Sequence, residues 1–419
     1  MVKKSYSWRE GAVLDEHSRR KHKILREYLV KYLETRCRLL HQSLFRVAVV
    51  DGFAGGGRYS DGSPGSPIII LEAVREGAER INLWRRQQGM QPVRVACEII
   101  LNDDDAEAFE CLKSAVAPVL GALREEVPEV TVNVEFFNKR WEELFPGVVD
   151  ALVRKNFRNV IFNLDQYGHS TVSPASIEAI MARFASPEVF LTFAIQSWLT
   201  FLQTTNPEQL ALQLQRTGVR RADLEELQGA ISNQATLGVA EKLVFASFKE
   251  RASYVSPFSI HNPEGWRYWM MHFARSQRAR QVYNDVLHEN SSNQAHYGRS
   301  GLNMLSYSPK EESGFLYLFD RPARERAREQ LLDDIPRFVS GAGDALLVGE
   351  FYEQVYNETP AHADDIKAAM IESPEIEVRS ETGNLRRKPH QIGPSDVIRF
   401  NKQGHFFDII GRRSKPKQS

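Results

Sequence analysis

The amino-acid sequence predicts an α/β protein built on a doubly wound parallel sheet. Apolar segments that resemble strands alternate with helical patterns through the first half of the chain, at residues 46–51, 93–101, 130–137, 160–164 and 189–195. Strands alternating with helices at this spacing are typical of βαβ units. A glycine-rich turn directly after the first strand, from Asp51 to Gly57, supports the same fold class.

The helices between these strands are predicted from apolar periodicity and from residues that favour helix ends. Residues 17–36 carry apolar side chains at spacings of three and four, as an amphipathic helix does. Pro67 suits the first turn of a helix over 67–80. The other helices expected here cover 104–116, 141–154 and 174–184.

The pattern changes after residue 200. Residues 206–250 are rich in Leu, Gln, Glu and Arg with helical periodicity, which indicates a helical insertion. Residues 266–289 predict a further helix, and the segments Leu302–Tyr307 and Phe315–Phe319 predict a β-hairpin. Five parallel strands closed by a hairpin fit the methyltransferase variant of the Rossmann fold.

The C-terminal part is compatible with a small winged-helix module. Thr359-Pro360 is a good helix start for a stretch ending near Ser373, and β-like segments follow at 375–379 and 397–400. From 376 to 419 there are ten Lys and Arg against four Asp and Glu. Three of these cations are candidate contacts to nucleic-acid phosphates, with a solvated loop as the alternative: Arg386, Arg387 and Lys388.

These segments predict four parts along the chain. A Rossmann domain begins at 1–205, a helical insertion follows at 206–250, and the Rossmann domain is completed at 251–340. A basic winged-helix-like module occupies 341–419.

Composition excludes several classes of protein. Among 419 residues, 54 Lys and Arg balance 54 Asp and Glu, so no overall field draws the chain to nucleic acid or membrane. The three cysteines lack the spacing of a disulfide framework or a metal site. With no secretory-type leader and no apolar run of the ~18 residues that a membrane span needs, we expect a cytoplasmic protein without a bound metal.

Polar residues follow the predicted strands at their carboxyl ends, where open α/β sheets bind ligands. They are Asp51, Asn102, Asp103, Asn138 and Asp165. Asp103 has the short carboxylate that can accept hydrogen bonds from both hydroxyls of a ribose, although the acidic run 103–105 also suits a helix start. Asn138 is a candidate contact to adenine or a simple loop residue. The order of these groups predicts an S-adenosylmethionine (SAM) site.

The turn after the first strand is the expected cradle for this cofactor. Glycine at 55 and 57 permits positive φ and close backbone approach to a ligand. Its candidate cofactor contacts are Asp51, Phe53, Ala54, Gly55 and Gly57. A purely structural turn is the alternative.

Asp165-Gln166-Tyr167-Gly168 is the segment where chemistry is expected. In methylation of an amino group, an aromatic ring stacks on the base and a carboxylate or carbonyl accepts the amino hydrogen. Asp165 and Tyr167 supply both groups. The alternative is a strand end in which Asp165 bonds nearby backbone amides. On the preceding helix, Lys21, His22 and Lys23 suit a solvated basic face, with a helix that covers the methionine end of the cofactor as the alternative.

Several of these segments resemble the three-Cys-motif partner (TcmP) proteins. The resemblance rests on Lys21–Leu29, Val50–Tyr59, Gly65-Ser66-Pro67 and Asp165–Gly168, and it covers about residues 17–200. It implies a Rossmann-type methyltransferase-like fold. It also implies a partner with a cysteine motif, of a kind that includes radical SAM enzymes.

A broader similarity is to the adenine amino-methyltransferases of DNA. It implies that Asp51, Phe53, Gly55 and Gly57 contact the cofactor, Asp103 its ribose, and Asp165 and Tyr167 the target base. Those enzymes have Asp-Pro-Pro-aromatic where this chain has Gln166 and an aromatic one residue sooner. The two prolines shape the backbone around the amino group, so this departure bears on activity.

Two functional hypotheses follow. The first is a SAM-dependent methyltransferase that acts on DNA or RNA together with a partner protein. The second is a non-catalytic protein that binds nucleic acid or a partner on a methyltransferase scaffold. Gln166 favours the second hypothesis, whereas the glycine turn, Asp103 and Tyr167 favour the first.

Overall fold

The computed structural model describes most of the chain, and it divides the chain into two units. The described residues are Trp8 and 11–401, apart from 167–170, 195–207, 209–217, 220–242, 257–258, 262–266, 291–293, 299–300, 304–314 and 318. The two units are Met1–Gln294 and Ala295–Ser419. Tyr167 therefore lies outside the described residues, as does the predicted insertion at 206–250 apart from 208, 218–219 and 243–250.

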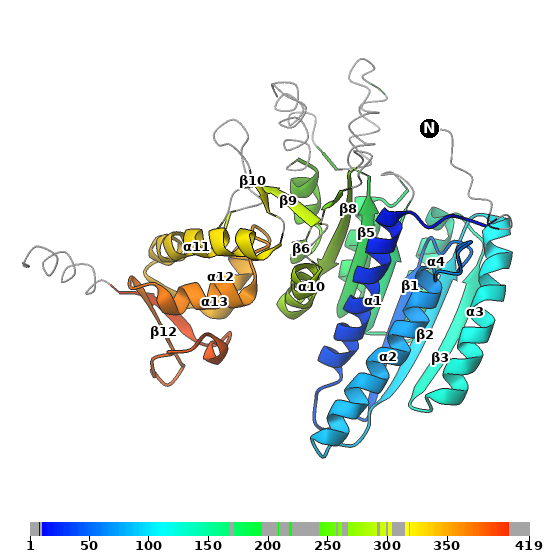
Figure 1. The fold of residues 1–419 in the computed structure, drawn as a ribbon, viewed down its shortest axis with the longest axis horizontal. Helices are drawn as coiled ribbons and strands as arrows, with labels where there is room; N and C mark the ends of the chain where they lie inside the picture. The colour runs from blue at the N-terminus through cyan, green and yellow to red at the C-terminus, as the bar shows by residue number, and fades with distance from the viewer. Residues whose placement is uncertain are drawn as a thin grey trace, which may run out of the picture. The chain divides into compact units, whose positions relative to one another are not determined.

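The first unit is built on a sheet whose order reverses beside its first strand (Figure 1). Five strands are parallel and lie in the order β3-β2-β1-β4-β5. Their bounds are β1 Leu44–Asp51, β2 Arg94–Asn102, β3 Val130–Phe137, β4 Asn159–Leu164 and β5 Ser186–Phe193. The sequence-based prediction of these strands and of the α/β fold class is confirmed. The reversal between β1 and β4 is the place where such sheets bind ligands.

A hairpin closes the sheet beyond β5, but it comes from a different segment than predicted. β8 (Arg267–Ala274) runs antiparallel to β5. The short β6 (Tyr254–Ser256) and β7 (Ser259–His261) both pair antiparallel with β8 in one unbroken register, so they lie on one strand line. The second strand of the predicted hairpin is present as β10 (Phe315–Tyr317), which pairs with β9 (Gln294–Gly298). Most of its predicted first strand, 302–307, lies outside the described residues.

The helix predicted over 266–289 is wrong in its first part, because 267–274 is β8 and the helix α10 covers only Gln277–Glu289. Every residue from Trp269 to Ala274 is buried. A strand covered on both faces shows no alternation, and its continuous apolar run cannot be told from a buried helix by periodicity.

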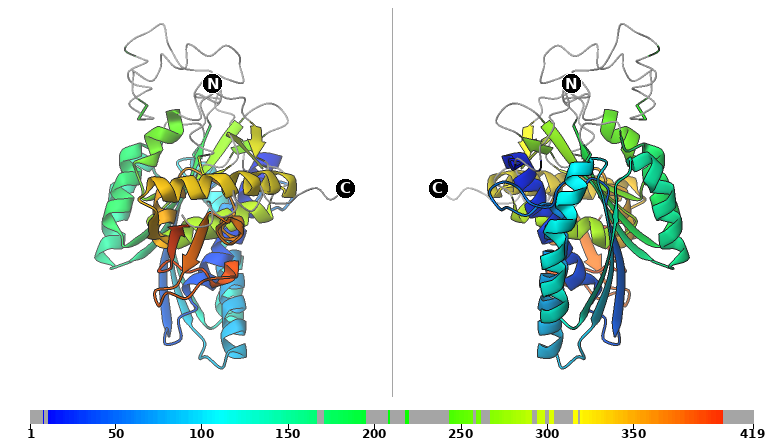
Figure 2. Two further views of the ribbon diagram at one scale, coloured as in Figure 1. Left: turned by 90° about the vertical axis from the view of Figure 1, so that its left-hand side faces the viewer. Right: turned by 90° about the vertical axis from the view of Figure 1, so that its right-hand side faces the viewer.

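Helices cover both faces of this sheet (Figure 2). One layer contains α1 (Glu16–Arg36), α2 (Ser66–Gln87), α3 (Ala106–Glu126) and α10, and the other contains α4 (Trp141–Arg154) and α5 (Pro174–Arg183). α1 and α2 approach closely because α2 has Gly77 at the contact, where a Cβ would lie 2.8 Å from the side chain of Leu33. The helices near residues 17, 67, 104, 141 and 174 are thus confirmed, and none that the structure describes is long and apolar enough to cross a bilayer.

The second unit has the order of elements of a winged helix. After β9 and β10, its elements are α11 (Arg321–Gly341), β11 (Ala345–Leu347), α12 (Val348–Val355), α13 (Ala363–Glu372), β12 (Ile376–Arg379), the 3₁₀ turn η4 (Pro389–Gln391) and β13 (Val397–Phe400). The strands form an antiparallel sheet in the order β11-β13-β12. This sequence of helix, strand, two helices and a two-stranded wing confirms the winged-helix prediction.

The winged helix begins earlier than residue 341. α11 packs against α13, and Arg324 on α11 forms two hydrogen bonds of 2.7 and 2.9 Å with Asp365 on α13. Thr359 is not the cap of α13, which begins after His362. The Thr359 hydroxyl is buried instead, where it donates to the carbonyl of Gly301 and accepts from the amide of Ala361.

Candidate functional site

The glycine turn after β1 is fixed to the ends of the neighbouring strands. The Gly52 amide donates to the carbonyl of Asn163 at the end of β4 (3.0 Å), and the Ala54 amide donates to the carbonyl of Asn102 at the end of β2 (2.8 Å). Because both anchors are backbone groups of the sheet, the turn is held at the carboxyl edge between β4 and β2.

Asp103 joins the turn to the ends of β2 and β3. One carboxylate oxygen accepts the Gly55 amide (2.8 Å) and the other accepts the Asp105 amide (3.0 Å). The Asn138 side chain donates to the Asp103 carbonyl (2.8 Å). Burial raises the pKa of the Asp103 carboxyl, against the lowering effect of these two backbone amides. The structure therefore brings three of the predicted cofactor contacts together.

The helix start expected in the acidic run falls on Asp105. Its carboxylate accepts the amides of Glu107 and Ala108 in the first turn of α3. Asp104 is exposed and its side chain has no hydrogen bond within the described residues. Asp103 is thus left to face the turn.

Asn102 holds the edge together from inside. It is 1% exposed, and its amide nitrogen donates to the carbonyls of Gly52 and Lys139, both at 3.0 Å. Its amide oxygen accepts the Lys139 amide at 3.2 Å. Both hydrogens of the amide are therefore used within the protein.

Phe53, a predicted cofactor contact, is partly buried, and its ring centroid lies 6.0 Å from that of Trp141.

Asp51 lies beneath the turn rather than on its surface. It is fully buried, and one carboxylate oxygen accepts from the Asn163 side chain (3.2 Å) and the Phe53 amide (3.4 Å). Burial raises the pKa of Asp51 to about 7, although hydrogen bonds from Ser66 and Asn163 oppose this effect. The structure gives this predicted cofactor contact a supporting position.

An indole covers the glycine turn in this structure. Gly55 and Gly57 have φ of +61° and +82°, as the sequence predicted for a tight turn. A Cβ at Gly55 or at Gly56 would lie 2.6 Å from the ring of Trp8. A Cβ at Gly57 would lie 2.9 Å from Ala115 on α3. Glycine is thus required here by the protein's own packing.

A second cluster forms at the end of β4, where Lys21 of α1 meets Asp165. The Lys21 ammonium lies 2.5 and 2.6 Å from the two carboxylate oxygens, and Lys21 is 8% exposed. Burial alone would raise the pKa of Asp165, but the Lys21 ammonium and a Thr192 hydrogen bond bring it below the ordinary value. Asp165 is therefore an ionised carboxylate near neutral pH.

The basic face predicted for α1 is not solvated. His17, Lys21 and His22 are buried, and Lys23 is exposed. Burial, followed by repulsion from Lys21, lowers the pKa of His17 to about 3 and that of His22 to about 4. Both rings are neutral at physiological pH. The sequence contained a signal for this burial, because positions 17 and 21 continue the apolar stripe of α1 toward its N-terminus at a spacing of about one helical turn.

Gln166, two residues after β4, is held by hydrogen bonds to Thr171 and Val172. Its side-chain oxygen accepts the amides of Thr171 (2.9 Å) and Val172 (2.8 Å), and the residue is 2% exposed. Its amide nitrogen has no hydrogen-bond partner within the described residues. Gln166 thus ties the end of β4 to Thr171 and Val172.

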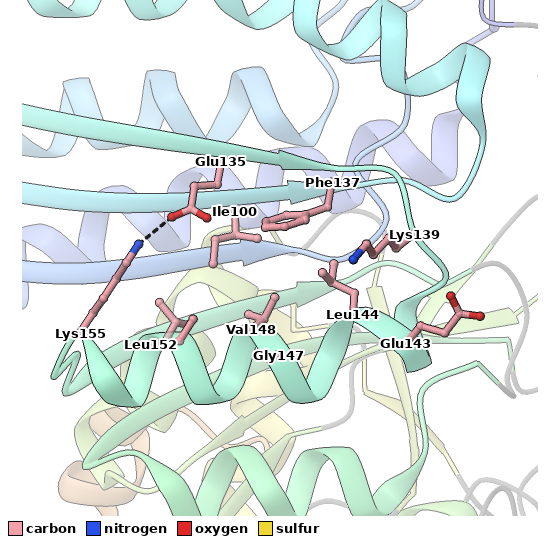
Figure 3. Close-up of a pocket in the computed structure, with 11 residues that line it drawn as sticks. Ile100, Glu135, Phe137, Lys139, Glu143, Leu144, Gly147, Val148, Leu152 and Lys155 are labelled. Carbon is pink, nitrogen blue, oxygen red and sulfur yellow. Dashed lines mark hydrogen bonds and ion pairs between the residues drawn. The ribbon is translucent and has the colours of Figure 1, made fainter.

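A pocket of about 230 Å³ lies between α4 and the strands β2 and β3 (Figure 3). Ile100, Phe137, Leu144 and Val148 line its apolar middle. At one end Lys155 pairs with Glu135 at 2.6 Å.

Among the described residues, no group of three or more His, Cys, Asp or Glu side chains is placed to hold a metal ion.

The fold and site define a class, an α/β protein with a methyltransferase-like sheet and a winged-helix module. Residues 306–383 match the model of a family described as a GMT-like wHTH domain, where wHTH denotes a winged helix-turn-helix. This match extends from before β10 into the wing after β12. A comparison with curated proteins gives no match.

Two solved structures are similar to the chain. One is the O-methyltransferase TomG from Streptomyces achromogenes in complex with SAM, with 13% identity and a TM-score of 0.25. The other is an O-methyltransferase candidate from Klebsiella pneumoniae, with 10% identity and a TM-score of 0.23. Each match covers 63% of this chain and 92% of the other. At these TM-scores the likeness adds nothing to what the strand order shows.

Replacing Asp51 with asparagine should change how stability depends on pH. Between about pH 4 and pH 7 the folded protein keeps a proton on Asp51 that the unfolded chain releases, so stability falls as pH rises through this window. Asp51→Asn removes the titrating group and should increase the free energy of unfolding at pH 8 by up to about 4 kcal/mol. Urea unfolding at pH 4 and pH 8 measures this. An equal effect at both pH values would contradict it.

Replacing Gly56 with alanine should displace Trp8. Gly56 lacks positive φ, so its Cβ would act only through contact with the indole. We expect altered tryptophan emission. Gly62→Ala is the matched control, because Gly62 has φ of +80° with no atom within 4 Å of a Cβ. It should cost about 1–3 kcal/mol through strain, with unchanged emission. Identical emission of both variants and the wild type would show that Trp8 does not rest on the turn.

Proposed function

We propose that the first unit binds SAM and transfers its methyl group to an amino group of nucleic acid. The observation that carries the proposal is the hydrogen bond from the Gly55 amide to Asp103, which joins the glycine turn after β1 to the acid after β2. Each Asp103 oxygen accepts one hydrogen bond and has a second lone pair. The partly exposed carboxylate therefore suits the two hydroxyls of a ribose.

The residues present fit this cofactor by the chemistry of their donors and acceptors. Asp103 would hold the ribose and Asn138 would lie beside the adenine. The turn at Gly55 would face the methionine end once the Trp8 indole that covers it has moved. SAM supplies an electrophilic methyl group when it is bound. Asn102 and Asp51 hold the turn from below, which keeps its shape independent of the ligand.

Asp165 would orient the acceptor amine. Its carboxylate is kept ionised by Lys21, so it can accept a hydrogen bond from an amino group without first losing a proton. An amine whose hydrogen is held in this way points its lone pair away from the carboxylate, toward an incoming electrophile. The neutral rings of His17 and His22 add no positive charge that would repel the electrophilic methyl donor. Tyr167 would stack on the base.

A second candidate function is a non-catalytic protein on the same scaffold. It is favoured by the Lys21 ammonium, which bonds both oxygens of Asp165, and by Gln166, which replaces the proline of related enzymes. In either case the resemblance to the TcmP family suggests a three-Cys-motif protein as the partner. Co-purification of that protein with the full chain tests this part of the proposal.

Asp103→Asn should weaken SAM binding. Its amide oxygen still accepts the Gly55 amide, but the other carboxylate acceptor is replaced by a donor. Loss of a charge-assisted hydrogen bond of about 1.5–3 kcal/mol predicts a roughly tenfold to hundredfold higher Kd by calorimetry. Asp104→Asn is the matched control and should leave Kd unchanged. Absence of SAM binding by the wild-type protein at millimolar ligand would sink the cofactor assignment.

Asp165→Asn should separate binding from methyl transfer. Removal of the charged acceptor is expected to reduce transfer of labelled methyl to DNA or RNA by about a hundredfold or more, with SAM affinity changed less than about twofold. Asp150→Asn, at an exposed ion pair with Arg183, is the control. Thermal unfolding of the same variants distinguishes lost chemistry from lost fold. SAM binding by the wild-type protein without transfer to either nucleic acid would favour the non-catalytic function.

A further inference from the structure

Helix α13 occupies the position of the recognition helix in the winged-helix unit, but it is acidic. Residues 363–372 contain Asp364, Asp365 and Glu372 against a single cation, Lys367. Asp365 pairs with Arg324 of α11 (2.7 Å), and Glu372 pairs with Arg328 of the same helix. Asp364 is exposed in the first turn of α13, where it would face a phosphate backbone with like charge.

The wing between β12 and β13 is tied down by its own hydrogen bonds. The turn 380–384 is closed by the Gly383 amide on the Ser380 carbonyl (2.8 Å), and the Arg386 amide returns to the carbonyl of Val378 on β12 (2.7 Å). The β12 strand is therefore paired on both sides, with β13 and with the returning wing segment. The first part of the wing is therefore a short β-ribbon.

Arg386 is part of this framework. Its guanidinium forms two hydrogen bonds of 2.9 Å with the Asp396 carboxylate, which is 2% exposed and also accepts the Gly393 amide. Hydrogen bonding to Asp396 raises the pKa of Arg386, and the same contact helps to lower the pKa of Asp396 against its burial. Arg386 thus positions the wing.

The next two residues are free to contact a ligand. Arg387 and Lys388 are exposed, and neither forms an ion pair within the described residues. They follow directly on the fixed Arg386, so the framework that holds Arg386 also presents them at the surface.

We propose that the wing, through Arg387 and Lys388, binds the phosphate backbone of a DNA duplex while α13 stays out of the groove. This rests on the nucleic-acid substrate of the proposed function. A B-form major groove is wide enough to admit a two-stranded β-ribbon between its two phosphate backbones, whereas the major groove of an RNA duplex is too deep and narrow for one. Phosphate contacts carry no sequence information, so this unit binds DNA regardless of sequence.

Fluorescence anisotropy of the full chain with short duplexes of two unrelated sequences tests the proposal. Arg387→Ala/Lys388→Ala should weaken binding about tenfold or more and reduce the slope of log K against log salt by about two. Arg326→Ala/Arg337→Ala is the matched control, because it removes the same charge from exposed positions on α11. We expect this control to bind as the wild type does.

Asp364→Ala distinguishes the wing from the helix. If α13 stays out of the groove, affinity should change by less than about twofold. Severalfold tighter binding would place α13 against the phosphates and overturn the proposal, as would tenfold discrimination between the two sequences or preference for an RNA duplex. DNA binding that Arg387→Ala/Lys388→Ala leaves unchanged would overturn the wing assignment alone. If the wild-type chain binds no nucleic acid at all, the nucleic-acid substrate of the proposed function is excluded as well.

Discussion

The side-chain amide of Asn102 is the contact on which the arrangement of the site depends. Its three hydrogen bonds and its own carbonyl tie together the ends of β1, β2 and β3. Because the amide is buried, loss of any of these bonds would leave a polar group without a partner, at a cost of about 1–3 kcal/mol. The position of Asp103 follows from this anchor, since it is the next residue along the chain. The path of the glycine turn is therefore set by the sheet before any ligand binds.

The partly buried pair of Lys21 and Asp165 is weak evidence for a purely stabilising role. Removing two charges from water costs several kcal/mol, and an apolar pair of similar volume would hold α1 against β4 at least as well. The two histidines beside the pair, His17 and His22, are neutral because burial lowers their pKa values. An ion pair of Lys21 and Asp165 thus lies at the carboxyl end of β4, with two neutral imidazoles beside it. Perturbed ionisable groups of this kind are enriched at functional sites, which is why the proposed function places the acceptor amine beside Asp165.

The parts of the structure that the sequence predicted best are those with a local cause. The parallel strands were predicted because burial on both faces leaves continuous apolar runs, and β3 because its exposed residues alternate at the sheet edge. The environment of Lys21 was not predicted, because its partner lies 144 residues away in sequence. The same reason applies to β8, whose apolar run fits a helix until its pairing with β5 is known. Trp8 over the glycine turn has no signal in the sequence at all.

A common feature of both units is that a polar residue held by hydrogen bonds precedes the one available to a ligand. Asn102 is fixed inside and Asp103 is partly exposed; Arg386 is bonded to Asp396 and Arg387 is exposed. In extended backbone, successive side chains point to opposite sides, so one residue can anchor the segment while the next faces outward. The number of charged residues in the sequence is therefore larger than the number of charges available to a partner. At the wing, Asp396 neutralises Arg386, which leaves the adjacent cations as the available charge.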